Sequence, residues 1–195
     1  MNHRLASLLS LSIAAILAGQ AASAADLKMK FVYGGNDAPE REDVAVTADK
    51  AFCGPFGLKD ESLIVNPDNF GIKNVVVYVY TGRGGSKIDD IDLEKHTHVL
   101  ANNQCRFDPR IVIAHAGDTL KVTNPDEVGH NANMGFLKNQ QFNRTIPAGG
   151  ELDVPLAKSE PVPIPVECNI HPWMKAFVMV LDHPYAGVSN ADGEL

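Results

Sequence analysis

Short runs of β-branched and aromatic residues, each closed by Gly, Pro or Asn, recur along this sequence and leave little room for helices. Such runs are typical of β-strands. The predicted strands comprise residues 27–33, 74–81, 110–115, 119–124, 151–154 and 176–182. The sequence Ala116-Gly117-Asp118 between two of them is a hairpin signal, and only residues 89–94 carry a weak helical stripe. The sequence therefore predicts an all-β fold in which two sheets form a sandwich or a barrel.

The first 24 residues have the layout of a secretory signal peptide. Arg4 precedes the apolar stretch 5–18, and Ala22-Ser23-Ala24 has the small residues that signal peptidase recognises. The alternative is an uncleaved membrane anchor, which the stretch disfavours because crossing a bilayer takes about 20 apolar residues. We therefore expect cleavage after Ala24. The product is a single domain, residues 25–195, which is periplasmic or otherwise exported and has no membrane span.

The charge of the chain limits its partners. The formal net charge is −7, and loss of Arg4 with the signal peptide makes it −8. Nucleic-acid phosphates need basic patches, so an acidic chain argues against nucleic acid as a partner. A basic protein partner remains compatible with this charge.

Three cysteines, at positions 53, 105 and 168, make an odd number for an exported chain. Two of them can form a disulfide in an oxidising compartment, which leaves one thiol over. A free thiol exposed to oxidants is oxidised further unless something occupies it. A metal ion is one such occupant, and the count alone leaves open which cysteine would bind it.

Residues 168–174 read Cys-Asn-Ile-His-Pro-Trp-Met and supply the strongest chemical signal. Thiolate and thioether sulfur favour copper, especially Cu(I), and imidazole suits both of its oxidation states. Methionine is the discriminating residue, because structural zinc sites use Cys, His and carboxylates. A second histidine is still needed, and His130 follows a predicted strand in a turn-like segment, residues 124–131. Just before the loop stands a run of prolines, for which we expect an edge strand or an extended connection over residues 162–166.

These segments resemble the cupredoxin family. Residues 107–120, followed by Asn124 and Gly129-His130-Asn131, are similar to the pattern F-x-P-x-x-I-x-V-x-x-G-D-T with N-x-D-x-x-x-H-N. Residues 168–174 resemble the short ligand loop of amicyanin, C-x-x-H-P-x-M. The resemblance covers about residues 104–182. The wider pattern, including the segment around Cys53, resembles cupredoxin-like methylamine-utilisation proteins.

The resemblance implies a Greek-key β-sandwich of the cupredoxin type with an extended N-terminal part. It also implies one copper ion of type 1. His130, Cys168 and His171 would form the trigonal ligand set, and Met174 would be the weak axial ligand. Asn131 would tie the two ligand segments together, since such outer contacts orient metal ligands.

Other positions are interpreted around this core. Pro172 and Trp173 are expected to form an apolar rim at an exposed edge of the His171 imidazole, where electrons pass. Glu167 departs from the family, which often has an aromatic residue before the cysteine. Its carboxylate would either point inward, where it would alter the copper site, or face water.

Cys53 and Cys105 remain as the candidate disulfide pair. A bridge between them would leave Cys168 free for copper and stabilise the fold by about 2–4 kcal/mol. Their distance in space does not follow from the sequence.

The leading functional hypothesis is transfer of single electrons between redox protein partners that meet the protein in transient contacts. The alternative is a copper carrier or buffer without redox turnover. We expect no enzymatic activity, because no H-C-H or paired H-x-H motifs of a multicopper oxidase surround Cys168, and a binuclear centre would need a second cysteine where Pro172 stands. His96 and His98 share one face of a strand. A solvated face is favoured there over a second metal site.

Overall fold

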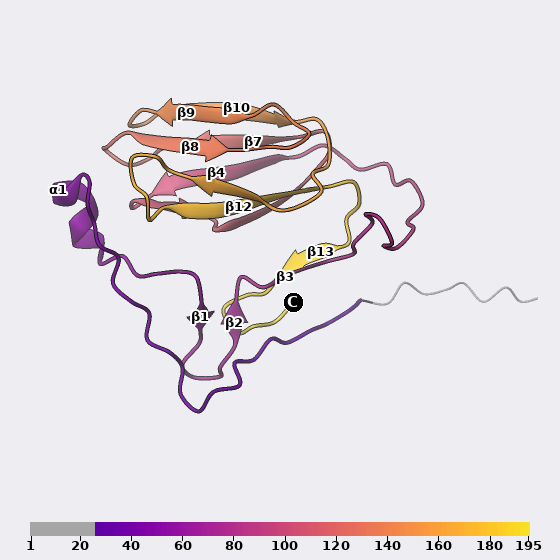
Figure 1. Cartoon of the computed structure of the whole chain (residues 1–195), viewed down its shortest axis with the longest axis horizontal. Helices are drawn as coiled ribbons and strands as arrows, with labels where there is room; N and C mark the ends of the chain where they lie inside the picture. The colour runs from indigo at the N-terminus through magenta and orange to yellow at the C-terminus, as the bar shows by residue number, and fades with distance from the viewer. Residues whose placement is uncertain (1–25) are drawn as a thin grey trace, which may run out of the picture.

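The structure, a computed structural model, describes residues 26–195 (Figure 1). The predicted signal peptide, residues 1–24, lies outside the described residues. Two sheets stack against each other. The four-stranded sheet has the order β10 (Glu151–Leu156), β7 (Asp118–Thr123), β4 (Thr97–Asn103), β5 (Arg106–Asp108). The five-stranded sheet has the order β6 (Ile111–His115), β12 (Lys175–Leu181), β11 (Ile164–Glu167), β8 (His130–Met134), β9 (Phe142–Ile146). The predicted all-β sandwich is confirmed.

Smaller elements flank the sandwich. They are α1 (Lys50–Cys53), the 3-10 turn η1 (Gly54–Phe56), and two two-stranded sheets, which pair β1 (Ile64–Val65) with β2 (Ile72–Lys73) and β3 (Val76–Tyr78) with β13 (Ala186–Val188). Figure 1 shows α1 at one end of the sandwich and the two small sheets beneath it. Within residues 26–195 we find no helix with the length and apolar character needed to cross a membrane.

Three local predictions are wrong. The two strands around Ala116-Gly117-Asp118 form no hairpin, because β6 and β7 lie in different sheets. The Asp118 carboxylate secures this corner by accepting the backbone N–H of His115 at 2.7 Å and of His96 at 2.8 Å. Residues 27–33 form no continuous β-strand and make only isolated β-bridges.

The third wrong prediction concerns the proline-rich strand. β11 lies inside its sheet, between β12 and β8, and not at an edge. It pairs with β12 along its whole length but with β8 only at Val166 and Glu167. Pro165 therefore stands beyond the end of the β8 pairing, where its missing N–H leaves no acceptor of β8 unpaired. Glu167 itself is exposed and approaches Lys175 at 4.0 Å.

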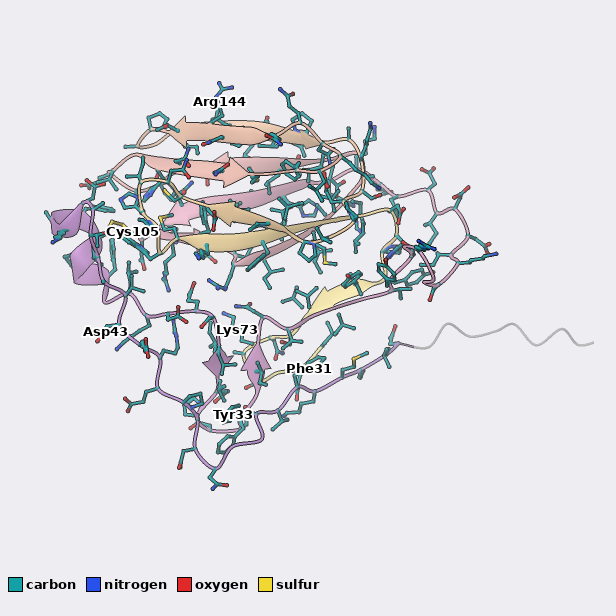
Figure 2. All side chains as sticks on the ribbon, viewed as in Figure 1. Phe31, Tyr33, Asp43, Lys73, Cys105 and Arg144 are labelled. Carbon is teal, nitrogen blue, oxygen red and sulfur yellow. A yellow bond between two sulfur atoms is a disulfide. The ribbon has the colours of Figure 1, made fainter. Side chains whose placement is uncertain are left out.

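Two groups of buried residues stabilise the molecule. The larger core fills the space between the sheets and includes Leu100, Leu120, Met134, Ile146, Val166 and Val178. A smaller cluster of Cys53, Leu58 and Cys105, with Trp173 against it, joins the α1 segment to the end of the sandwich. A disulfide links Cys53 to Cys105 across a sequence separation of 52, so the predicted pair is confirmed. Figure 2 shows Cys105 beside α1. Cys168 is free and buried.

A buried carboxylate predicts acid sensitivity. Glu160 accepts the backbone N–H groups of Leu137, Lys138 and Asn139 at 2.9–3.1 Å. Burial raises the pKa of Glu160, but the N–H donors of Asn139, Lys138 and Leu137 outweigh it and hold the pKa below its usual value. This contribution to stability is present above the unfolded pKa of about 4.3 and is lost as the pH falls through the lower folded pKa.

We expect Glu160→Gln to lower the free energy of unfolding at pH 7 by about 1–3 kcal/mol, because the N–H donors lose a charged acceptor. The difference from the wild type should shrink at pH 3, as measured by urea unfolding at both pH values. Glu127→Gln, at an exposed carboxylate, is the matched control and should change neither value. If the free energies of unfolding of Glu160→Gln and the wild type differed by the same amount at pH 7 and pH 3, the role of Glu160 as a charged acceptor would be contradicted.

Candidate metal centre

The loop from Cys168 to Met174 connects β11 to β12 and folds back on itself. The backbone N–H of Cys168 donates to the carbonyl of Met174 at 3.3 Å, and the N–H of Met174 donates to the carbonyl of His171 at 2.9 Å. The side chains of Cys168, His171 and Met174 are at most 2% exposed. The loop thus turns three potential ligands away from solvent. The Met174 side chain lies within the main core, together with Cys168.

His130 reaches this loop because it is the first residue of β8, the strand beside β11. Its Nδ1 lies 3.0 Å from Nδ1 of His171. The Sγ of Cys168 lies 3.7 Å from the same Nδ1 of His171. These three potential ligand atoms are within 4.8 Å of one another, and all three residues are buried. The structure therefore brings together three of the four predicted ligands at one point.

Two carboxylates determine which nitrogen each imidazole presents to that point. His130 Nε2 lies 2.8 Å from Asp126 Oδ2, and His171 Nε2 lies 2.9 Å from Asp49 Oδ2. An ionised carboxylate only accepts hydrogen bonds, so each Nε2 carries its hydrogen and each Nδ1 offers a lone pair. Two lone pairs facing each other at 3.0 Å repel unless a cation lies between them, either a proton or a metal ion. With a thiol beside them, these donors fit a metal ion.

The charge state of His130 suits this role. Burial lowers the pKa of His130 below its ordinary value, although the hydrogen bond to Asp126 opposes the shift, and the neighbouring His171 lowers the pKa further. The neutral imidazole is the form that binds metal ions.

Backbone groups and Asn131 hold the sulfur in place. The N–H of Asn131 donates to Cys168 Sγ at 3.3 Å, and the N–H of His171 donates to it at 3.4 Å. Both N–H groups point at the sulfur and fix its position. The side-chain oxygen of Asn131 accepts the N–H of Asn169 at 3.2 Å, so this residue spans the two ligand segments.

The prediction that one edge of the His171 imidazole is exposed is wrong. His171 is 0% exposed, because Asp49 lies against its outer nitrogen. Pro172 is exposed and Trp173 is half-buried. The Trp173 ring lies 5.1 Å from the His171 ring, and its Nε1–H donates to the carbonyl of Cys105 at 3.0 Å. Trp173 therefore packs toward the disulfide and does not rim an open imidazole.

Sequence reasoning missed both carboxylates. Asp126 lies four residues before His130 inside a segment already noted as ligand-bearing, so a search for an oxygen partner of the imidazole could have found it. Asp49 is 122 residues from His171, and no spacing connects them.

The H-x-H pair is separate from this centre. His96 is exposed, and His98 Nε2 lies 2.8 Å from Asp118 Oδ2. Within residues 26–195, a second cluster of potential ligand atoms joins Cys105, Asp126 and His130. Cys105 is already committed to the disulfide.

No protein-family model matches the chain, and no curated protein matches it. Among solved structures, it is similar to a methionine-to-alanine mutant of amicyanin with Cu(I), at 16% identity and a TM-score of 0.39, over 43% of this chain and 81% of that one. An oxidised proline-to-alanine mutant of amicyanin has 17% identity and a TM-score of 0.39 over the same shares. A Cu-containing nitrite reductase from Thermus scotoductus SA-01 has 19% identity and a TM-score of 0.40, over 49% of this chain and 24% of that one. The similarity to amicyanin indicated by the sequence is thus found among solved structures, over less than half of this chain.

Proposed function

We propose that this protein is a one-electron carrier built around one copper ion of type 1. His130, Cys168 and His171 would be its close ligands, and Met174 would be the weakest donor. The observation that carries the proposal is the meeting of two imidazole Nδ1 atoms 3.0 Å apart beside a buried thiol, with both Nε2 atoms committed to carboxylates. Sulfur and imidazole donors in this combination suit copper better than other common metals.

The residues of the site are arranged to change little during electron transfer. A bound copper ion would accept one electron from one redox partner, as Cu(II) becoming Cu(I), and would give it up to the next partner. Asp126 and Asp49 each hold one imidazole ring, and two backbone N–H groups hold the Cys168 sulfur. Ligands restrained from outside keep one compromise geometry for both oxidation states, so transfer requires little rearrangement.

An electron carrier is favoured over an enzyme because the site is closed to solvent. Metal catalysis needs an open coordination position for water or substrate. His130, Cys168 and His171 are buried, and Met174 is the fourth donor assigned here. The proposal therefore includes redox protein partners and no substrate.

We also propose that the single domain, residues 25–195, acts in the periplasm after removal of residues 1–24. The Cys53–Cys105 disulfide supports an oxidising compartment, since such bridges form and persist there.

Copper carriage or buffering is the second candidate, and one observation favours it. His171 is covered by Asp49 and 0% exposed, which suits retention of an ion and removes the exposed imidazole edge that was expected for electron transfer. A carrier needs soft sulfur to retain Cu(I), and it need not show intense thiolate-to-Cu(II) absorption.

Met174→Leu separates the two functions. For an electron carrier, the wild type shows a strong visible band with copper, and the variant keeps copper and colour while its reduction potential rises. The rise follows because Cu(II) needs the lost electron density more than Cu(I) does. A tenfold change in relative affinity is about 59 mV for one electron, so we expect a rise of at least about 60 mV in voltammetry.

Met179→Leu, at a buried methionine of β12, is the matched control and should leave the potential unchanged. A colourless wild-type Cu(II) complex and a heavy loss of Cu(I) affinity in Met174→Leu would favour the copper carrier. Unchanged spectrum, potential and affinity would show that Met174 is not a ligand.

A further inference from the structure

The outer edge of His171 is covered by a segment from far away in the sequence. Asp49 Oδ2 lies 2.9 Å from His171 Nε2. The imidazole side chain is 0% exposed, whereas the Asp49 side chain is 41% exposed. Asp49 therefore stands between the buried ring and solvent.

The local structure of Asp49 is unusual for its position. Asp49 occupies the N-cap of α1, where an aspartate normally accepts a hydrogen bond from the first turn and stabilises the helix by about 1 kcal/mol. Its side chain makes no such bond. Its backbone adopts the left-handed conformation, with φ 43° and ψ 44°, which non-glycine residues adopt rarely. The carboxylate contacts His171 in place of its own helix, and strained residues of this kind cluster at functional sites.

The segment that carries Asp49 is fastened to the site. The carbonyl of Asp49 accepts the N–H of Cys53 at 2.8 Å, and Cys53 is bridged to Cys105. The N–H of Cys105 donates to Asp126 Oδ2 at 2.8 Å, and the same oxygen lies 2.8 Å from His130 Nε2. Each half of the disulfide is thus connected to one histidine–carboxylate pair. We call residues 49–56, which include α1 and η1, the cap.

We propose that Asp49 is a positioning residue of the metal centre and that the cap is a lid that keeps outside ligands from His171. Asp49 holds the hydrogen on Nε2 of His171, so Nδ1 keeps the lone pair that would bind the metal ion. Without this carboxylate the ring can take its other tautomer, and water can reach its outer edge. The lid role rests on the proposed function, because it assumes that the metal ion is copper. The positioning of the His171 ring by Asp49 does not depend on that function.

The first test uses metal-free protein, so it does not depend on the proposed function. Nitrogen-15 NMR of the imidazoles should show His171 with its hydrogen on Nε2 in the wild type and a loss of that preference in Asp49→Ala. Asp49→Asn, which keeps an acceptor oxygen, should restore it. The matched control is Asp43→Ala, also on the N-terminal segment (Figure 2), where an exposed carboxylate pairs with Lys59. It should resemble the wild type.

The second test uses copper-loaded protein and added azide. The wild-type visible and EPR spectra should not respond, whereas Asp49→Ala should bind azide and show about 10–100-fold weaker copper affinity. An unchanged His171 tautomer in Asp49→Ala overturns the positioning role. An equal azide response in the wild type and Asp49→Ala overturns the lid. A wild type that binds no copper defeats the proposed function and the lid with it, while the NMR result still decides the role of Asp49.

Discussion

Cys168→Ser is expected to abolish the intense visible band of the copper-loaded protein. The band arises from charge transfer between the thiolate and Cu(II), and serine removes the donor of that charge. Cys168 is 2% exposed, and its sulfur accepts two backbone N–H groups. The other two cysteines within residues 26–195 are bonded to each other, so no other free thiol there can replace it. We expect Cu(II) that remains bound to be nearly colourless, with EPR typical of nitrogen and oxygen ligands.

Ala176→Ser is the matched control, since it buries the same hydroxyl at a fully buried position of β12 without touching the sulfur. Circular dichroism of both variants verifies that the sandwich is folded. If the band persisted in Cys168→Ser at wild-type intensity, its donor would lie elsewhere, and the ligand set proposed here would fail.

The double variant Cys53→Ala/Cys105→Ala is expected to lower the free energy of unfolding by about 4 kcal/mol. The chain-entropy relation gives this value for a bridge that closes a loop with a sequence separation of 52. Urea unfolding without reductant measures it. The loss is large because the whole stability of a domain is about 5–15 kcal/mol.

Metal-free Cys168→Ser serves as the control for this measurement, because it removes a sulfur and leaves the bridge intact. A double variant within about 1 kcal/mol of the wild type would mean that the bridge constrains the unfolded chain little.

The parts of the fold and site that could be predicted are those encoded by neighbouring residues. Cys168, His171 and Met174 stand in one short loop, and their order alone indicated a soft metal site. The disulfide followed from assigning a separate role to one of three cysteines. Runs of apolar and β-branched residues located β7 and β12 to within one residue at each end.

The errors arose where distant segments decide the outcome. Proline at position 165 suggested an edge strand, and the interior position of β11 is compatible with it only because β8 pairs no further than Val166. The turn before Asp118 looked like a hairpin, yet β6 and β7 do not pair with each other. β6 pairs with β12, and β7 pairs with β4 and β10. The burial of His171 depends on Asp49, which local spacing does not link to it.

The seclusion of Cys168 also bears on how the protein matures. Three thiols allow three different single bridges, and only one of them leaves Cys168 for a metal ion. Thiol–disulfide exchange requires a thiolate that can reach the sulfur it attacks. Once the sandwich has formed, Cys168 is enclosed by its loop and the core, so it is withdrawn from that competition. A chain whose sheets assemble before oxidation therefore reaches the native bridge directly, whereas oxidation of the unfolded chain yields isomers that have to be reshuffled.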